Sequence, residues 1–362
     1  MNTGFHSKLP NPTMDFRTLD SILQIYETQP RKFRFQAQTL PDWQNWREAL
    51  SEKLVELLGG FAQDRSPLNP VLIDSTQEPG YLLEKVAFES EPGSYVPCYI
   101  LIPDQVKPPY RPVIALHGHG TGGANYLLGL PCDVSNRQAE EAIIQQYNHD
   151  YARQLAQRNF MVFVPVQRGL GERLETAPGM VNFTGAGQSS CRMLSFNAML
   201  LGKTLLGMRV WDVMRTIDYI RSRPEPMIAG LGCLGLSGGG TTTLFATALD
   251  ARISTAVVSG YFNRFRSSIM AMVHCECNYI PHLLEVAEMS DIAGLIAPRP
   301  LLIESGTRDG IFPVEAALEA YKDLEQVYNL LGVPEALDKD IFPADHQFSG
   351  AKAFDWLERW LT

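Results

Sequence analysis

The sequence lacks the long apolar runs that cross membranes. No stretch approaches the roughly 20 consecutive apolar residues that a spanning helix needs. The first residues, MNTGFHSKLPNPTMDF, lack the apolar core of a secretory signal. Cysteine is also scarce, because six in 362 residues are too few for a disulfide scaffold in a chain of this length. From these absences we expect a cytoplasmic protein with free thiols and no membrane partner.

The sequence also has fewer basic than acidic residues. The chain has 31 Lys and Arg against 40 Asp and Glu, which gives a net charge of −9. This balance argues against nucleic acid as a partner, because phosphate contacts need clustered basic residues. With 45% hydrophobic and 20% charged residues, the composition is that of an ordinary soluble enzyme. The length allows one large α/β domain or two small ones.

The periodicity of apolar residues predicts a helical start followed by an α/β domain. Helical spacing within residues 15–60 ends at a Gly-Gly pair, so we expect residues 1–78 to form an N-terminal helical extension packed on the main domain. Within that main domain, residues 79–362, a hairpin comes first, and short apolar runs then alternate with amphipathic stretches. This alternation predicts a mainly parallel central sheet with helices on both faces, and ligands bind such sheets at the carboxyl ends of the strands.

Two longer segments, 171–206 and 262–296, interrupt the alternation. Both follow predicted strands and therefore leave the sheet at its carboxyl edge. Long excursions at that edge usually shape a pocket, so we expect both segments to lie over the site. Ordinary connecting structure is the alternative.

The stretch LGLSGGGTTTLF, residues 234–245, packs four glycines around Ser237. A nucleophile elbow needs small residues two before and two after the serine, and Gly235 and Gly239 meet that spacing. A phosphate-binding loop usually carries a lysine near the start of the next helix, and none follows here. A formal G-x-G-x-x-G match exists upstream, but it falls within the predicted strand rather than after it. We therefore favour the nucleophile.

A nucleophilic serine needs a base and an orienting carboxylate. His346 follows the last predicted strand, and Asp309 follows the strand before it. Ser237, Asp309 and His346 thus project from the same edge of the sheet, in the chain order expected of an α/β-hydrolase. Glu304 lies five residues nearer the sheet than Asp309, and we expect it to be a buried, hydrogen-bonded carboxylate. Asp345 adjoins His346 and should point away from it.

An oxyanion hole needs two donors beside the nucleophile. The backbone N–H of Gly238 supplies one, and the loop LHGHGTGG, residues 116–123, should supply the other from the backbone of His119. A side-chain role for His117 or His119 stays open beside packing. The remaining histidines are expected at the surface or in packing. A single C-x-C at Cys275 and Cys277, next to one histidine, lacks the paired spacing of a zinc site, so we expect no metal and no cofactor.

The motifs LHGHG, GLSGGG and DIAGLIAPRPLLIESGTRDGIFP, the last followed by DHQF, resemble the α/β-hydrolases of the dienelactone-hydrolase and acetyl-xylan-esterase-like branch. The resemblance spans about residue 80 to the end. It implies an α/β-hydrolase fold with Ser237 as nucleophile, His346 as base and Asp309 as acid. Dienelactone hydrolases use cysteine as the nucleophile, so the serine favours the esterase side.

The resulting hypothesis is a serine hydrolase that cleaves carboxylic esters of small acyl groups. Its partner would be a small-molecule ester. A peptidase or amidase with the same triad, or a binding protein with an idle triad, are the alternatives. Arg168, Glu172, Arg209 and Asp212 are interpreted first as structural ion pairs.

Overall fold

A computed structural model describes residues 16–362 except 63–64, 121, 178, 180–181 and 185–186. Its centre is a nine-stranded mixed sheet with the strand order β1-β2-β3-β5-β4-β8-β9-β10-β11. The strands are β1 (Val71–Glu78), β2 (Tyr81–Glu91), β3 (Ser94–Pro103), β4 (Arg111–Leu116), β5 (Phe160–Pro165), β8 (Gly232–Leu236), β9 (Thr255–Ser259), β10 (Leu301–Gly306) and β11 (Leu337–Phe342). A separate two-stranded sheet pairs β6 (Asn182–Thr184) with β7 (Gly187–Ser189).

The six strands from β5 to β11 in that order run parallel, whereas β1, β2 and β3 form an antiparallel edge. Every residue of β5, β8, β9 and β10 is buried, as expected of parallel strands covered on both faces. In β2 and β3 buried and partly exposed positions largely alternate, which fits a hairpin with one covered face. The mainly parallel sheet predicted from the sequence is confirmed.

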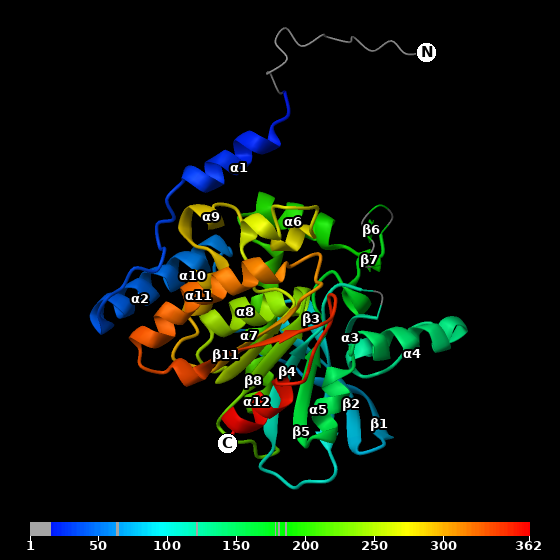
Figure 1. The fold of residues 1–362 in the computed structure, drawn as a ribbon. Helices are drawn as coiled ribbons and strands as arrows, with labels where there is room; N and C mark the ends of the chain where they lie inside the picture. Colours follow the sequence, from blue (N-terminus) through cyan, green and yellow to red (C-terminus); the bar gives the residue numbers. More distant parts are fainter. Residues whose placement is uncertain (1–15, 63–64, 121, 178, 180–181, 185–186) are drawn as a thin grey trace, which may run out of the picture.

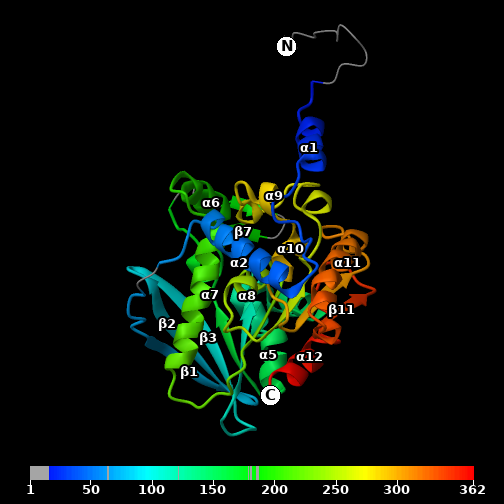
Figure 2. The same cartoon turned by 90° about the vertical axis from the view of Figure 1, so that its left-hand side faces the viewer.

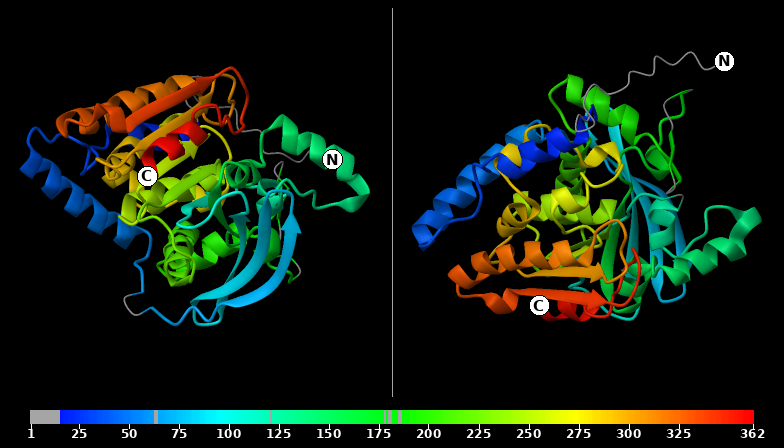
Figure 3. Two further views of the ribbon diagram at one scale, coloured as in Figure 1. Left: turned by 90° about the horizontal axis from the view of Figure 1, so that it is seen from below. Right: turned by 45° about the horizontal axis from the view of Figure 1, so that its top comes forward.

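Helices cover both faces of this sheet (Figures 1 and 2). One face packs against α2 (Leu40–Leu57), α7 (Leu205–Ser222), α8 (Gly238–Leu249), α10 (Met289–Gly294) and α11 (Val314–Leu330). The other packs against α3 (Gly123–Leu127), α5 (Tyr151–Gln157) and α12 (Ala353–Trp360). Helix α4 (Arg137–Gln146) extends from the body beside α3 (Figure 3). Over the described part of the chain, no helix has both the length and the apolar character required to cross a membrane.

The N-terminal segment differs from its sequence-based description in two respects. Helix α1 (Leu19–Thr28) buries none of its residues and projects from the body, which it contacts through a hydrogen bond from Tyr26 to Glu288, whereas α2 packs into the core through Trp43, Leu50 and Leu54. Residues 71–78, which we assigned to the helical extension, instead form strand β1 and pair with β2. Seven of the eight residues of β1 are exposed, so the strand carries no alternating apolar signal.

Both long excursions gather at the end of the sheet where the parallel strands finish (Figure 1). The first carries β6, β7 and α6 (Cys191–Leu200), and the second carries the 3-10 turn η4 (Glu276–Asn278) and α9 (Leu283–Val286). The two pack against each other where α6 meets η4. The elements that connect strands and helices thus form a layer over one edge of the sheet.

Candidate active site

Ser237 occupies the turn between β8 and α8. Its backbone has φ 58° and ψ −120°, a left-handed conformation that a serine adopts only where the surroundings impose it. The Ser237 N–H donates to the carbonyl of Ser259 at 2.9 Å, which fixes the turn against the neighbouring strand. The hydroxyl makes no capping hydrogen bond to α8. This is the backbone geometry of a nucleophile elbow.

The two flanking glycines are required by close packing. A Cβ on Gly239 would lie 2.0 Å from the carbonyl oxygen of Leu116, and one on Gly235 would lie 2.5 Å from the backbone of Gly239. No side chain fits at these distances, so the strand, the helix and the loop after β4 can approach only where both positions are glycine. The spacing that suggested the elbow therefore has a steric cause.

His346 and Asp309 form a pair at the same edge of the sheet. The Nδ1 atom of His346 lies 2.7 Å from Oδ2 of Asp309, whose Oδ1 accepts from the backbone of Ile311 and Phe312. Burial would raise the pKa of Asp309, but the hydrogen bond and charge of His346 outweigh burial and lower that pKa. Phe312 stacks on the imidazole, with ring centroids 5.7 Å apart. The carboxylate therefore orients the ring and stays ionised.

Gly260 connects this pair to the serine. It follows Ser259, which accepts from Ser237, and a Cβ on Gly260 would lie only 3.1 Å from Cε1 of His346. The imidazole thus packs directly on the end of β9, the strand beside the elbow. The structure brings the three predicted triad residues to one edge of the sheet.

The two rejected carboxylates lie in different environments. Glu304 is fully buried and accepts from the backbone N–H groups of Ser349 and Gly350, just after His346 in the chain. Burial raises the pKa of Glu304 to about 7. Asp345 is exposed and pairs with Arg308 at 3.0 Å. Glu304 thus anchors the loop that carries His346, and Asp345 points away from the ring.

The buried Glu304 gives a prediction for stability. Its pKa is higher in the folded than in the unfolded chain, so its contribution is complete at about pH 4 and is lost as pH rises through about 7. We expect this group to lower the free energy of unfolding by about 2.5 kcal/mol between pH 5 and pH 8. Urea denaturation of wild type and Glu304→Gln across that range measures the difference in slope. An Asp345→Asn control should keep the wild-type slope, and a slope unchanged by Glu304→Gln would contradict the assignment.

The two histidines of the 116–123 loop have different surroundings. His117 is buried, which lowers its pKa to about 4, and its Nε2 accepts from the backbone of Gln167 at 3.0 Å. It is a neutral side chain that shapes the loop. The backbone nitrogen of His119 lies 3.6 Å from the position of a Cβ on Gly238, and its ring covers the same glycine. The two backbone N–H groups predicted for the oxyanion hole are therefore neighbours.

Of the other histidines, His149 packs against Tyr126 and Tyr147, and His282 forms an exposed pair with Glu285. His6 lies outside the described residues. His274 lies beside Phe312 with its Nε2 buried and without a hydrogen-bond partner. Its pKa is lowered, mainly by burial.

Sequence spacing missed one set of residues. Cys275 and Cys277 do not join His274; instead, their sulfurs converge with Cys191 and the imidazole of His119. All four donor atoms lie within 4.8 Å of one another. The structure thus assembles a soft-metal donor set that we had discounted, because its members come from three separate segments.

The predicted ion pairs are present with one exception. Arg168 binds both carboxylate oxygens of Asp212 at 2.8 Å, Arg173 adds a third contact to Asp212 at 2.6 Å, and Glu172 pairs with Lys85. Arg209 is the exception, since its described partners are the carbonyl of Arg168 and the sulfur of Cys191.

A cavity of about 460 Å³ opens beside the loop that carries His119. Small residues and polar groups line it together: Gly120, Gly122, Ala124, Asn125, Cys132, Val166, Gly171, Glu172, Leu174 and Gln188. Ser237 and His346 are not among the lining residues, so the cavity lies to one side of the triad. Its volume falls within the range of small-molecule sites.

Comparison with known proteins places this arrangement in a family. A sequence model described as "Abhydrolase family" matches residues 18–339. The Bacillus subtilis (strain 168) protein YtaP, whose name assigns it provisionally to the hydrolases, is 24% identical over 320 residues, which cover 86% of this chain and 98% of YtaP.

Two solved structures share the fold. A protein from Bacteroides fragilis, provisionally identified as an acetyl xylan esterase, superposes with a TM-score of 0.73 at 18% identity, over 91% of this chain and 83% of that one. A glucuronoyl esterase from Solibacter usitatus superposes with a TM-score of 0.64 at 14% identity, over 93% and 100%. The α/β-hydrolase fold expected from the motifs is confirmed.

Proposed function

This chain belongs to the Abhydrolase family, and from that premise we propose that it is a serine hydrolase that cleaves carboxylic esters through an acyl-enzyme. The observation that carries the proposal is the strained Ser237, placed at the edge of the sheet where Asp309 holds His346. A serine is kept in such a conformation where its hydroxyl must be presented to a substrate. The esterases with the same fold support the ester as substrate.

In the proposed reaction, Nε2 of His346 accepts the proton of the Ser237 hydroxyl as the oxygen attacks the ester carbonyl. Asp309 keeps the other proton on Nδ1 and stabilises the imidazolium that forms. The backbone N–H groups of Gly238 and His119 donate to the negative oxygen of the tetrahedral intermediate. His346 then protonates the leaving alcohol, and water releases the acid by the same steps in reverse.

We further propose that the acyl group is small and the alcohol polar. The cavity beside the His119 loop mixes glycines with Asn125, Glu172 and Gln188, which suits a hydroxyl-rich alcohol rather than a long hydrocarbon. The excursions that pack over the carboxyl edge contribute buried apolar groups such as Ile269 and Ile280. We propose that this packing limits the room for a long acyl chain.

A series of p-nitrophenyl esters of rising chain length tests this size limit. We expect kcat/KM to be highest from acetyl to butyryl and to fall steeply by octanoyl. A deep apolar tunnel would do the opposite, since each buried methylene is worth about 0.8 kcal/mol. Octanoyl or longer esters as the best substrates would contradict the small-acyl proposal and leave the esterase proposal standing.

The same panel, extended to acetylated sugars and aminoacyl anilides, separates the functional alternatives. Hydrolysis of anilides at rates comparable with esters would favour a peptidase or amidase. An absence of turnover on every compound would favour a binding protein.

We propose the cytoplasm as the site of action, with no nucleic acid or membrane as partner. All six cysteines are free, and four of them are buried without a disulfide partner: Cys98, Cys191, Cys233 and Cys277. Cell fractionation with thiol quantification tests this proposal, and recovery of the native protein from a secreted fraction would overturn it.

A further inference from the structure

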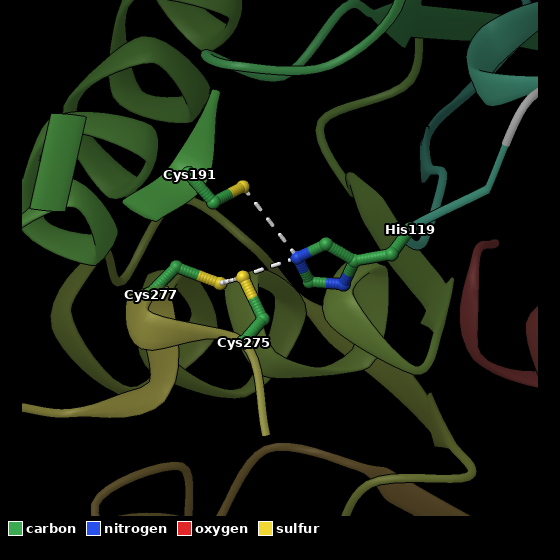
Figure 4. Close-up of side chains that lie close together, drawn as sticks. All are labelled: His119, Cys191, Cys275 and Cys277. Atoms are coloured by element: carbon green, nitrogen blue, oxygen red, sulfur yellow. Dashed lines mark hydrogen bonds between the residues drawn. The ribbon is translucent and has the colours of Figure 1, made fainter. Parts of the chain in front are cut away.

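Three cysteine sulfurs and one imidazole nitrogen converge beside the loop after β4 that carries His119, which we call the oxyanion loop (Figure 4). Nε2 of His119 lies 3.3 Å from the sulfur of Cys277 and 3.7 Å from that of Cys191. The sulfurs of Cys277 and Cys275 are 3.2 Å apart. Cys191 and Cys277 are buried, and the other two are partly exposed. No disulfide joins any of these thiols.

We propose that these four side chains bind one Zn²⁺ ion. In a tetrahedral site with Zn–S bonds near 2.3 Å, two sulfurs lie about 3.8 Å apart, and a sulfur and a nitrogen lie about 3.5 Å apart. The two sulfur–nitrogen contacts of 3.3 and 3.7 Å fall close to the expected value, whereas the 3.2 Å contact between the sulfurs of Cys275 and Cys277 would have to lengthen by about 0.6 Å. The widest separation, at most 4.8 Å, would have to shorten by about 1 Å. Tetrahedral sulfur and imidazole ligands select zinc among the common divalent metals.

Arg209 provides the charge that such a site requires. Zinc with three thiolates and a neutral imidazole carries one net negative charge, and binding would release the three thiol protons to solvent. Arg209 is buried beside the cluster, and its Nη2 donates to the sulfur of Cys191 at 3.1 Å. Among the described residues, no carboxylate pairs with Arg209, which also donates to the carbonyl oxygen of Arg168. The buried cation is therefore available to neutralise the zinc–thiolate group.

The proposed ion would connect three segments that the sheet alone does not hold together. His119 belongs to the loop after β4, Cys191 is the first residue of α6, and Cys275 and Cys277 flank the start of η4. The ring of His119 covers Gly238, since a Cβ there would lie 2.6 Å from Nδ1. Four protein ligands leave no position for substrate or water, so the ion would be structural. It would position the oxyanion loop and both excursions without taking part in the chemistry.

Metal content gives the direct test, and it does not depend on the proposed esterase activity. Protein produced without a histidine tag and dialysed against metal-free buffer should hold about one zinc per chain by elemental mass spectrometry. Cys277→Ser and Cys191→Ser should each lower the affinity for zinc at least ~10-fold, measured by competition with a chelator, because losing a ligand should cost no less than losing an outer-shell partner. The matched control, Cys132→Ser, should keep its zinc, since Cys132 lies outside the cluster.

Cobalt substitution keeps the proposal testable if the serine variants fail to fold. Wild-type protein reloaded with Co²⁺ should show the thiolate-to-cobalt charge-transfer band and the intense visible bands of a tetrahedral sulfur-rich site. Chelator treatment should lower the unfolding temperature, and added zinc should restore it.

Three results would overturn the proposal: purified and zinc-reloaded wild type both free of metal, zinc bound with wild-type affinity by Cys277→Ser and Cys191→Ser alike, or peptide mass mapping of the native protein that shows two of the cluster cysteines joined as a disulfide.

Discussion

A Ser237→Ala variant is expected to lose nearly all ester turnover, a fall on the order of 10⁶-fold in kcat, while it keeps the wild-type fold. The loss is large because the triad acts as a unit, and without the hydroxyl no acyl-enzyme forms. The fold should survive because the Ser237 hydroxyl makes no capping bond to α8 and alanine adds no atom. Steady-state kinetics with p-nitrophenyl acetate and a thermal melt measure the two quantities separately.

Covalent labelling gives this experiment its control. A serine-directed phosphonate should add once to wild type and not to Ser237→Ala. Ser135→Ala, a change at an exposed serine paired with Asp133, should keep both turnover and labelling. Turnover that persists in Ser237→Ala would remove this serine from the mechanism.

The triad candidates could be found from sequence because each follows a predicted strand. Ser237 and Asp309 follow β8 and β10, which are apolar runs buried at every position. His346 follows β11, which is only partly buried and was located by the alternation of strands and helices. Parallel strands bring those loops to one edge whatever the distance between them along the chain. Ser237, Asp309 and His346 are therefore placed by topology, and no long-range contact had to be guessed.

Strand β1 illustrates the opposite case. Its pairing with β2 satisfies its backbone, but seven of its eight side chains are exposed. Without a buried face, the period-2 pattern that signals a strand does not arise. The absence of this pattern explains why the sequence predicts a helical extension as far as residue 78, although residues 71–78 form a strand. Helix α1 shows the converse. Its apolar residues have the spacing of an amphipathic helix, and the helix forms, but Leu19, Ile22 and Ile25 are exposed.

The spacing of residues along the chain does not predict the cluster of His119, Cys191, Cys275 and Cys277. His119 and Cys191 are 72 residues apart, and His119 and Cys277 are 158 apart. Zinc motifs are recognised when two ligands lie close together in each of two segments, whereas here only the Cys275–Cys277 pair is local. The two excursions and the oxyanion loop come together only through the tertiary fold. Arg209 has no carboxylate partner among the described residues. It lies beside the cluster because of the way α7 packs, which the sequence does not reveal.

The choice of Asp309 over Glu304 as the triad acid leads to the second large expected effect. In Asp309→Asn, the amide would donate to Nδ1 of His346 and leave the proton on Nε2, where it blocks acceptance of the serine proton. We expect kcat to fall about 10⁴-fold, with KM and stability changed little. The backbone bonds from Ile311 and Phe312 to Oδ1 can remain, which preserves the loop.

Glu304→Gln provides the contrast. The carboxyl group of Glu304 accepts from the N–H groups of Ser349 and Gly350 in the loop after His346. No described hydrogen bond joins this group to the imidazole of His346. An amide has only one acceptor oxygen for these two donors, so this variant should hold the loop less tightly, and its free energy of unfolding should change less between pH 5 and pH 8 than that of wild type. Its kcat at 25 °C should stay within about 10-fold of wild type, since the ring is still oriented by Asp309. If Glu304→Gln abolished turnover in a fully folded protein and Asp309→Asn only reduced stability, the two carboxylates would exchange roles. The buried Glu304 would then be the triad acid.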